Sequence, residues 1–151
     1  MQRWDVADAP VPGDSPLGEA VASVGDRWVL LLVHALLDGP RRFGELLGDL
    51  PGIAPNILSE RLRRLERERV LVATPYSRKP PRFVYELTSS GRELAGTLRL
   101  LAQWGAGRAG AEGAADGLRH GPCGTPMEAR WYCPTCAEVV DDDHNEDLRF
   151  V

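Results

Sequence analysis

The chain has 151 residues, a mass of 16.6 kDa and a formal net charge of -4 at pH 7. Apolar residues make up 43% and charged residues 26%, as in globular proteins and unlike disordered chains. This length allows one domain plus an appendage and excludes a multidomain enzyme. The longest aliphatic run is Val29–Val33, and the acidic, Pro-rich start does not resemble a signal peptide. We therefore expect a cytoplasmic protein with no membrane contact.

The predicted elements follow a flexible lead-in over residues 1–14. Ser15 and Pro16 begin a helix that Gly25 ends, and Asp26 is placed to cap the next one. Apolar residues then recur at steps of three and four positions, the spacing of helices, and Gly and Pro interrupt the pattern. The pattern predicts four helices, over residues 15–25, 26–37, 43–50 and 55–69.

The spacing changes after the fourth helix. β-Forming residues in LVATPYS and FVYELT flank the run RKPPR, which predicts two antiparallel strands joined by an exposed basic tip. Ser89 or Ser90 is expected to cap a fifth helix that ends near Gly105. A Gly- and Ala-rich linker is expected over residues 106–118, a compact tail over 119–140 and an acidic end over 141–151.

Positive charge is concentrated in the middle of the chain. Between Pro40 and Arg82 there are ten Lys and Arg residues and five Asp and Glu residues, whereas both ends of the chain are acidic. Phosphate binding depends on local positive potential, so the negative total does not exclude a nucleic-acid partner. An Arg-rich solvated helix face has the same composition, and the charge alone leaves both interpretations open.

The order helix, helix, helix, hairpin is typical of a winged helix-turn-helix, in which one helix enters the DNA major groove. On the fourth helix the leucines share one side and the polar residues the other. We expect Asn56, Ser59 and Arg63 to contact bases, because Asn and Arg can bond adenine and guanine through two hydrogen bonds. Phosphate contacts are expected from Arg41, Arg42, Arg64, Arg67, Arg78, Lys79 and Arg82. Intrahelical ion pairs would also explain RLRRLERER, but the basic hairpin favours DNA.

The motifs GDRW, GPRRFGEL, LPGIAPNILSERLRRLE, PPRFVYELT and QWG together resemble the HxlR-type family, the MarR-like winged-helix transcriptional regulators of bacteria. The resemblance covers residues 15–105. It implies an α+β fold and a homodimer on a palindromic operator in double-stranded DNA, with the first and last helices forming most of the dimer contact. The expected dimer residues are Leu17, Val21, Leu94, Leu98, Leu101 and Trp104.

Thiol sensing at the first helix is not expected. Several redox- or electrophile-sensing members of the family carry a cysteine just before a proline at this place. The matching dipeptide here is Ser15-Pro16, and a serine hydroxyl cannot enter the sulfenate chemistry of a thiolate.

All three cysteines lie in the last 30 residues. His120, Cys123, Cys133 and Cys136 form a His-x2-Cys and a Cys-x2-Cys pair nine residues apart, which resembles a small zinc ribbon with tetrahedral Zn²⁺. A tail this short cannot bury a core, so a structural metal would supply its folding free energy. Free thiols on a disordered tail, a redox role for CPTC, and His144 in place of His120 remain alternatives.

These observations predict a DNA-binding transcriptional regulator that acts as a homodimer at a promoter operator and is not an enzyme. Its predicted architecture is a winged helix-turn-helix domain with flanking dimerisation helices and a zinc-ribbon-like tail. Two alternatives remain open. One is a metal- or redox-responsive transcriptional switch that uses the Cys and His residues of the tail, and the other is a protein-interaction adaptor without DNA binding.

Overall fold

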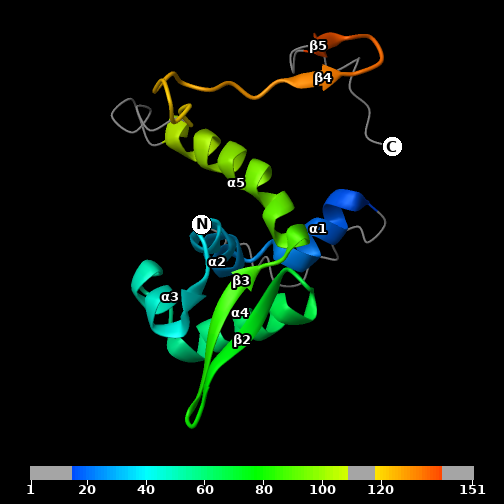
Figure 1. Cartoon of the computed structure of the whole chain (residues 1–151). Helices are drawn as coiled ribbons and strands as arrows, with labels where there is room; N and C mark the ends of the chain where they lie inside the picture. The colour runs from blue at the N-terminus through cyan, green and yellow to red at the C-terminus, as the bar shows by residue number, and fades with distance from the viewer. Residues whose placement is uncertain (1–14, 109–117, 141–151) are drawn as a thin grey trace, which may run out of the picture. The chain divides into compact units, whose positions relative to one another are not determined.

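The computed structural model describes residues 15–108 and 118–140 (Figure 1). The chain divides into two compact units, Met1–Leu98 and Arg99–Val151. The predicted lead-in, most of the predicted linker and the acidic end lie outside the described residues. Within residues 15–108 and 118–140, the helices lack the combination of length and hydropathy that crossing a bilayer requires.

The described residues form five helices and five short strands, in the mixed order that an α+β winged helix-turn-helix requires. The helices are α1 (Pro16–Val24), α2 (Arg27–Leu36), α3 (Phe43–Asp49), α4 (Pro55–Arg67) and α5 (Ser89–Arg108). The strands are β1 (Arg41–Arg42), β2 (Leu71–Arg78), β3 (Pro81–Leu87), β4 (Trp131–Cys133) and β5 (Glu138–Val140). The predicted end of the fifth helix near Gly105 is therefore about one turn too early.

Side-chain caps fix the starts of the first two helices, as the sequence predicts. The Ser15 hydroxyl accepts a hydrogen bond of 3.0 Å from the Gly18 amide. The Asp26 carboxylate accepts hydrogen bonds from the Trp28 and Val29 amides at 2.9 and 3.2 Å. Each cap satisfies amides that have no partner inside the helix, which stabilises a helix by about 1 kcal/mol.

Asp26 also joins α2 to α4. Nη2 of Arg61 lies 3.1 Å from its Oδ2 atom. Burial alone would raise the pKa of Asp26, but the hydrogen bond from Arg61 and those from the α2 amides outweigh it and lower the pKa. Because the folded-state pKa lies below the unfolded one, the stabilisation is present above the unfolded pKa and is lost as the pH falls through the folded pKa.

A single apolar core holds the helices of the first unit against the inner ends of the sheet. The leucines on one side of α4 point into this core, as predicted, and burying each such side chain contributes about 1.5–3 kcal/mol. The buried apolar residues are Val29, Leu32, Val33, Leu36, Leu46, Leu50, Ile53, Leu58, Leu62, Leu65, Val70, Leu71, Leu87 and Leu98.

The sheet of the first unit has the strand order β1-β3-β2 and is antiparallel. Strands β2 and β3 form the hairpin that we call the wing, and it projects well beyond the helices (Figure 1). The strands are longer than predicted, since Arg78 pairs with Pro81 and only Lys79 and Pro80 lie between them. Strand β1 was not predicted, because two residues carry no readable period.

Helix α4 ends two residues before the predicted position. Arg69 has φ 58°, a left-handed backbone conformation in which a helix cannot continue. The Val70 amide then donates a 2.9 Å hydrogen bond to the Leu65 carbonyl, which closes the last turn. The sequence has no glycine here to mark the stop, so periodicity alone extends the helix too far.

The cap of α5 is Thr88, so the prediction of Ser89 or Ser90 was wrong. The Thr88 hydroxyl accepts a 3.1 Å hydrogen bond from the Gly91 amide and donates one of 2.7 Å to the Arg69 carbonyl. Thr88 thus begins α5 and ties it to the chain that follows α4. Three consecutive hydroxyl residues satisfy the same capping rule, and only the tertiary contact selects among them.

Candidate nucleic-acid interface

The outer side of α4 carries the residues that were predicted to contact bases. Asn56, Arg63 and Arg67 are exposed and Ser59 is half-buried, while the leucines of this helix face the core. Among residues 15–108 and 118–140, Arg63 enters no salt bridge, whereas Arg61 pairs with Asp26 and Glu60. The side chains suited to hydrogen-bond base edges are therefore presented to solvent.

A groove of about 450 Å³ separates α4 from the wing. Ser59 and Arg63 line it on the helix side, and Phe83 and Tyr85 line it on the wing side. Phe43, Leu62, Glu66 and Ala73 complete its walls. The polar side of the helix and the hairpin therefore share one concave surface, which is the arrangement that the predicted interface requires.

A second groove of about 610 Å³ lies between the start of α3 and the wing. Phe43, Phe83 and Tyr85 line both grooves, so the concave surface continues from one to the other. Arg42 and Arg82 add positive charge to the second groove, and the Arg42 guanidinium lies 4.8 Å from the ring centroid of Tyr76. This cation–π contact holds the Arg42 guanidinium, which lies just before the start of α3, against the wing.

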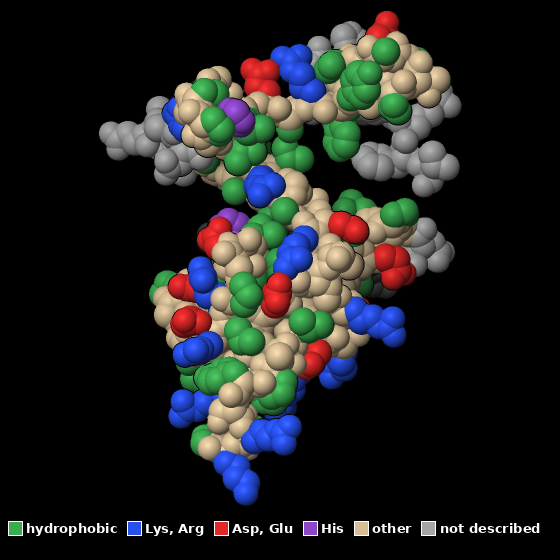
Figure 2. All heavy atoms as spheres, in the orientation of Figure 1, with side chains coloured by type: hydrophobic (Ala, Val, Ile, Leu, Met, Phe, Trp, Pro, Cys, Tyr) green, Lys and Arg blue, Asp and Glu red, His purple; other side chains and the backbone are tan. Residues whose placement is uncertain are grey.

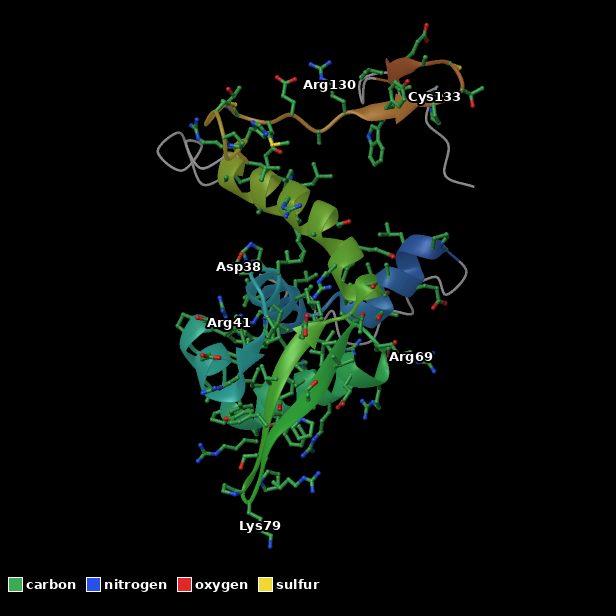
Figure 3. All side chains as sticks on the ribbon, viewed as in Figure 1. Asp38, Arg41, Arg69, Lys79, Arg130 and Cys133 are labelled. Atoms are coloured by element: carbon green, nitrogen blue, oxygen red, sulfur yellow. The ribbon has the colours of Figure 1, made fainter. Side chains whose placement is uncertain are left out.

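The tip of the wing is strongly basic. Arg78, Lys79 and Arg82 are all exposed, and Lys79 lies at the very end of the hairpin (Figure 3). Figure 2 shows several Lys and Arg side chains gathered over this end of the first unit. Exposed cations at the end of a projecting hairpin are suited to phosphate oxygens, which need charge more than fixed geometry.

Two of the predicted phosphate contacts are engaged elsewhere. The Arg64 guanidinium donates to the Ala22 carbonyl of α1, which leaves Arg64 less available to a phosphate than the predicted DNA-binding set requires. Nε of Arg41 lies 3.4 Å from Oδ2 of Asp49 in a partly exposed ion pair. Such pairs are weak in water, so Arg41 can still exchange Asp49 for a phosphate.

The sequence interpretation missed the aromatic floor of the grooves, formed by Phe43, Phe83 and Tyr85. Burial raises the pKa of Tyr85, the charge of Glu66 raises it further, and Arg63 opposes both. The phenol therefore stays neutral beside Arg63 and can both donate and accept hydrogen bonds. The alternation Phe83, Tyr85, Leu87 along one face of the predicted strand was the available signal for this floor.

The comparisons with known proteins agree with this geometry. The sequence profile of the HxlR-like helix-turn-helix family matches residues 23–112, more than half of the chain. The chain belongs to this family. The HTH-type transcriptional regulator Rv3095 of Mycobacterium tuberculosis is 39% identical over 125 residues, which cover 82% of this chain and 78% of the relative. The HTH-type transcriptional regulator YodB of Bacillus subtilis is 33% identical over 85 residues, 56% of this chain and 76% of YodB.

Solved structures give the same result. The redox regulator HypR in its reduced form has a TM-score of 0.59 and 29% identity, covering 63% of this chain and 94% of HypR. The transcription-factor candidate PA1607 has a TM-score of 0.74 and 30% identity, covering 93% of this chain and 96% of that protein. With 93% of 151 residues covered, the similarity to PA1607 must extend beyond the family match into the tail.

The apolar residues predicted for dimerisation fall into two groups in this HxlR-like chain. Leu17 and Val21 of α1 are exposed, at 73% and 46%, as are Leu101 and Trp104 of α5, at 46% and 63%. By contrast Leu98, at 6%, belongs to the core, and Leu94 packs against the core. Leu98 is therefore corrected to a core residue, because the first half of α5 covers its own domain, whereas the role of the half-buried Leu94 in a dimer stays a prediction. Leu100, which the prediction omitted, is exposed at 43%.

The four predicted metal ligands of the HxlR-like tail lie in two separate pairs. His120 Nδ1 lies 3.1 Å from Cys123 Sγ, and the thiols of Cys133 and Cys136 are hydrogen-bonded to each other. Throughout residues 15–108 and 118–140, no three His, Cys, Asp or Glu side chains come together as a metal site. The four-ligand zinc site stays a prediction.

Proposed function

We propose that this HxlR-like chain is a cytoplasmic transcriptional regulator that binds double-stranded DNA as a homodimer. Helix α4 lies in the major groove of a half-site, and the wing follows the neighbouring backbone. The observation that carries this proposal is the shared groove, in which Ser59 and Arg63 of α4 face Phe83 and Tyr85 of the wing. The family of the chain and the names of its relatives support the same function.

The contacts divide by chemistry into two sets. Asn56, Ser59 and Arg63 occupy the first two to three turns of α4 and contact base edges, which determine sequence preference. The other set, which we call the phosphate set, contacts the DNA backbone and consists of Arg41, Arg42, Arg67, Arg78, Lys79 and Arg82. It fixes the position of the protein on the DNA and supplies most of the electrostatic affinity.

A second copy of the chain covers the exposed apolar residues of α1 and α5. Leu17, Val21, Leu101 and Trp104 form surfaces that a monomer leaves in water, and burying large apolar side chains drives association. A two-fold dimer places two α4 helices on half-sites about one DNA turn, roughly 34 Å, apart. The operator is then palindromic, and occupancy near a promoter excludes or recruits polymerase.

The signal that controls binding of the operator does not act through a thiol at the start of α1. Ser15 stands at the place where redox-sensing members carry a cysteine, and its hydroxyl is engaged as the α1 cap. The hydroxyl cannot form a disulfide, so this position cannot work as a thiol switch.

Substitution of Trp104 tests the dimer. Trp104→Glu places a charge in the proposed interface, which we expect to weaken dimerisation by about 2–4 kcal/mol. Analytical ultracentrifugation should detect a shift towards monomer, and affinity for a two-half-site operator should fall much more than affinity for a single half-site.

The matched control is Gln103→Glu, which adds the same charge to the neighbouring exposed position of α5. This control should stay dimeric. A wild-type protein that occupies its operator as a monomer, or a Trp104→Glu variant that dimerises as tightly as wild type, would contradict the proposed assembly.

A further inference from the structure

The two cysteine-containing turns of the tail have the same local construction. His120 and Cys123 are separated by two residues, as are Cys133 and Cys136. In both turns the residue after the second of these side chains has a left-handed backbone, with φ 69° at Gly124 and φ 57° at Ala137. Alanine rarely adopts this conformation, so the second turn is not explained by local preference. Repetition of one geometry in two different sequences indicates a shared requirement.

Each turn directs its two potential ligands towards one point. In the first, Nδ1 of His120 and Sγ of Cys123 are 3.1 Å apart, and the backbone is closed by a 2.7 Å hydrogen bond from the Gly124 amide to the His120 carbonyl. Bond lengths of about 2.0 Å to nitrogen and 2.3 Å to sulfur place such ligands about 3.5 Å apart around tetrahedral zinc. A few tenths of an ångström of opening would therefore make this pair half of a zinc site.

The second turn offers the complementary half. The amides of Thr135 and Cys136 hydrogen-bond to the Cys133 sulfur, and the Cys133 and Cys136 thiols contact each other. Strands β4 and β5 hold the turn, with Cys133 paired to Glu138.

The tail has no core of its own to hold these turns. None of the residues 118–140 is buried, and the large side chains of Trp131, Tyr132 and Val139 are all more than half exposed. A hairpin of two three-residue strands is marginal in water without further support. A bound metal is the common source of stability in modules of this size.

We propose that one Zn²⁺ is bound by His120, Cys123, Cys133 and Cys136 of the same chain and joins the two turns into one module. The nine residues between Cys123 and Cys133 are enough for the chain to fold back and bring the pairs together. Three thiols release their protons to solvent as three Zn–S bonds form, the neutral imidazole supplies the fourth bond, and the hydrated ion loses its waters. With four protein ligands the site is structural rather than catalytic. This proposal is independent of DNA binding.

Cobalt substitution of the full-length protein tests the ligand set. The metal-free, reduced chain is titrated with Co²⁺, whose ligand-field bands report tetrahedral geometry and whose charge-transfer band reports thiolate bonds. We expect one Co²⁺ per chain, competed off by one Zn²⁺, and Cys123→Ser, Cys133→Ser, Cys136→Ser and His120→Asn each to weaken binding by about 100-fold or more. Each serine variant should also lose about one third of the charge-transfer intensity.

The matched control is His144→Asn, which should bind like wild type. Circular dichroism of each variant should keep the helical signal of the winged-helix domain, which separates loss of the site from general unfolding. Limited proteolysis adds a second measurement, in which Zn²⁺ should protect the bonds between Gly124 and Tyr132.

Several outcomes would overturn the proposal. Loss of metal binding in His144→Asn but not in His120→Asn would show that His144, and not His120, is the fourth ligand. One metal per two chains would place the site between copies. Formation of a Cys133–Cys136 disulfide by a reduced chain that takes up no Co²⁺ or Zn²⁺ would make the second turn a redox pair instead.

Discussion

Arg63→Ala is expected to weaken operator binding by about 1–3 kcal/mol per half-site and to flatten the preference at one base pair. Arg63 is exposed on the outer side of α4 and lines the groove shared with the wing. Its guanidinium can donate two hydrogen bonds to one guanine, and alanine can donate none. Fluorescence anisotropy with the operator and a set of its single-base-pair variants measures both effects.

The matched control is Arg64→Ala, one position along the same helix. Because the Arg64 guanidinium is bound to the Ala22 carbonyl, we expect the ranking of operator variants to stay unchanged. Arg63→Lys should restore charge without restoring the two-bond geometry, so it should recover affinity more than preference. An Arg63→Ala protein that loses affinity equally for every operator variant would reassign Arg63 to the phosphate set.

Gly91→Ala is expected to destabilise the winged-helix unit by about 3 kcal/mol, at the upper end of the usual cost of overpacking. A methyl group at position 91 would lie 2.1 Å from the Val70 carbonyl oxygen and 3.1 Å from Leu87 Cδ2. The backbone oxygen cannot move away, since the Thr88 amide and hydroxyl both hydrogen-bond to it. Helix α5 would have to lift from the chain that follows α4. Urea unfolding followed by circular dichroism measures the change.

Gly96→Ala adds the same methyl group to the same helix, in open space. It should stabilise the protein by up to about 1 kcal/mol, the usual advantage of alanine over glycine within a helix. The two substitutions thus have opposite expected signs. If Gly91→Ala were as stable as wild type, the close packing of α5 on Val70 would be wrong.

The sequence predicts the parts of this fold that depend on local rules. Ser15 and Asp26 cap helices because their side chains reach amides two or three residues away, and this needs no tertiary knowledge. The inward side of α4 follows from the spacing of its leucines. The basic hairpin follows from Pro80 and Pro81 between two runs of β-forming residues.

The failures occur where a distant part of the chain decides the outcome. Leu98 has the same helical spacing as Leu101, and only the packing of α5 on its own domain makes one a core residue and leaves the other exposed. Arg64 and Arg63 are neighbours of the same type, and only the contact of Arg64 with α1 distinguishes their surroundings. The aromatic floor of the grooves depends on how β2 and β3 pair, because that register places Phe83 and Tyr85 opposite α4. The position of the floor relative to α4 is therefore a tertiary feature.

The dependence of operator affinity on salt concentration tests the central claim most directly, since a protein that binds DNA through phosphate contacts releases counterions. With three to five of the six phosphate-set residues of each protomer in contact at once, the logarithm of affinity should fall against the logarithm of salt concentration with a slope of about -5 to -9 for the dimer. In Lys79→Ala the slope should become shallower by about 2, one phosphate for each wing tip, with the ranking of operator variants preserved. A flat response to salt in the wild-type protein, or a slope that Lys79→Ala leaves unchanged, would contradict the placement of α4 and the wing on DNA.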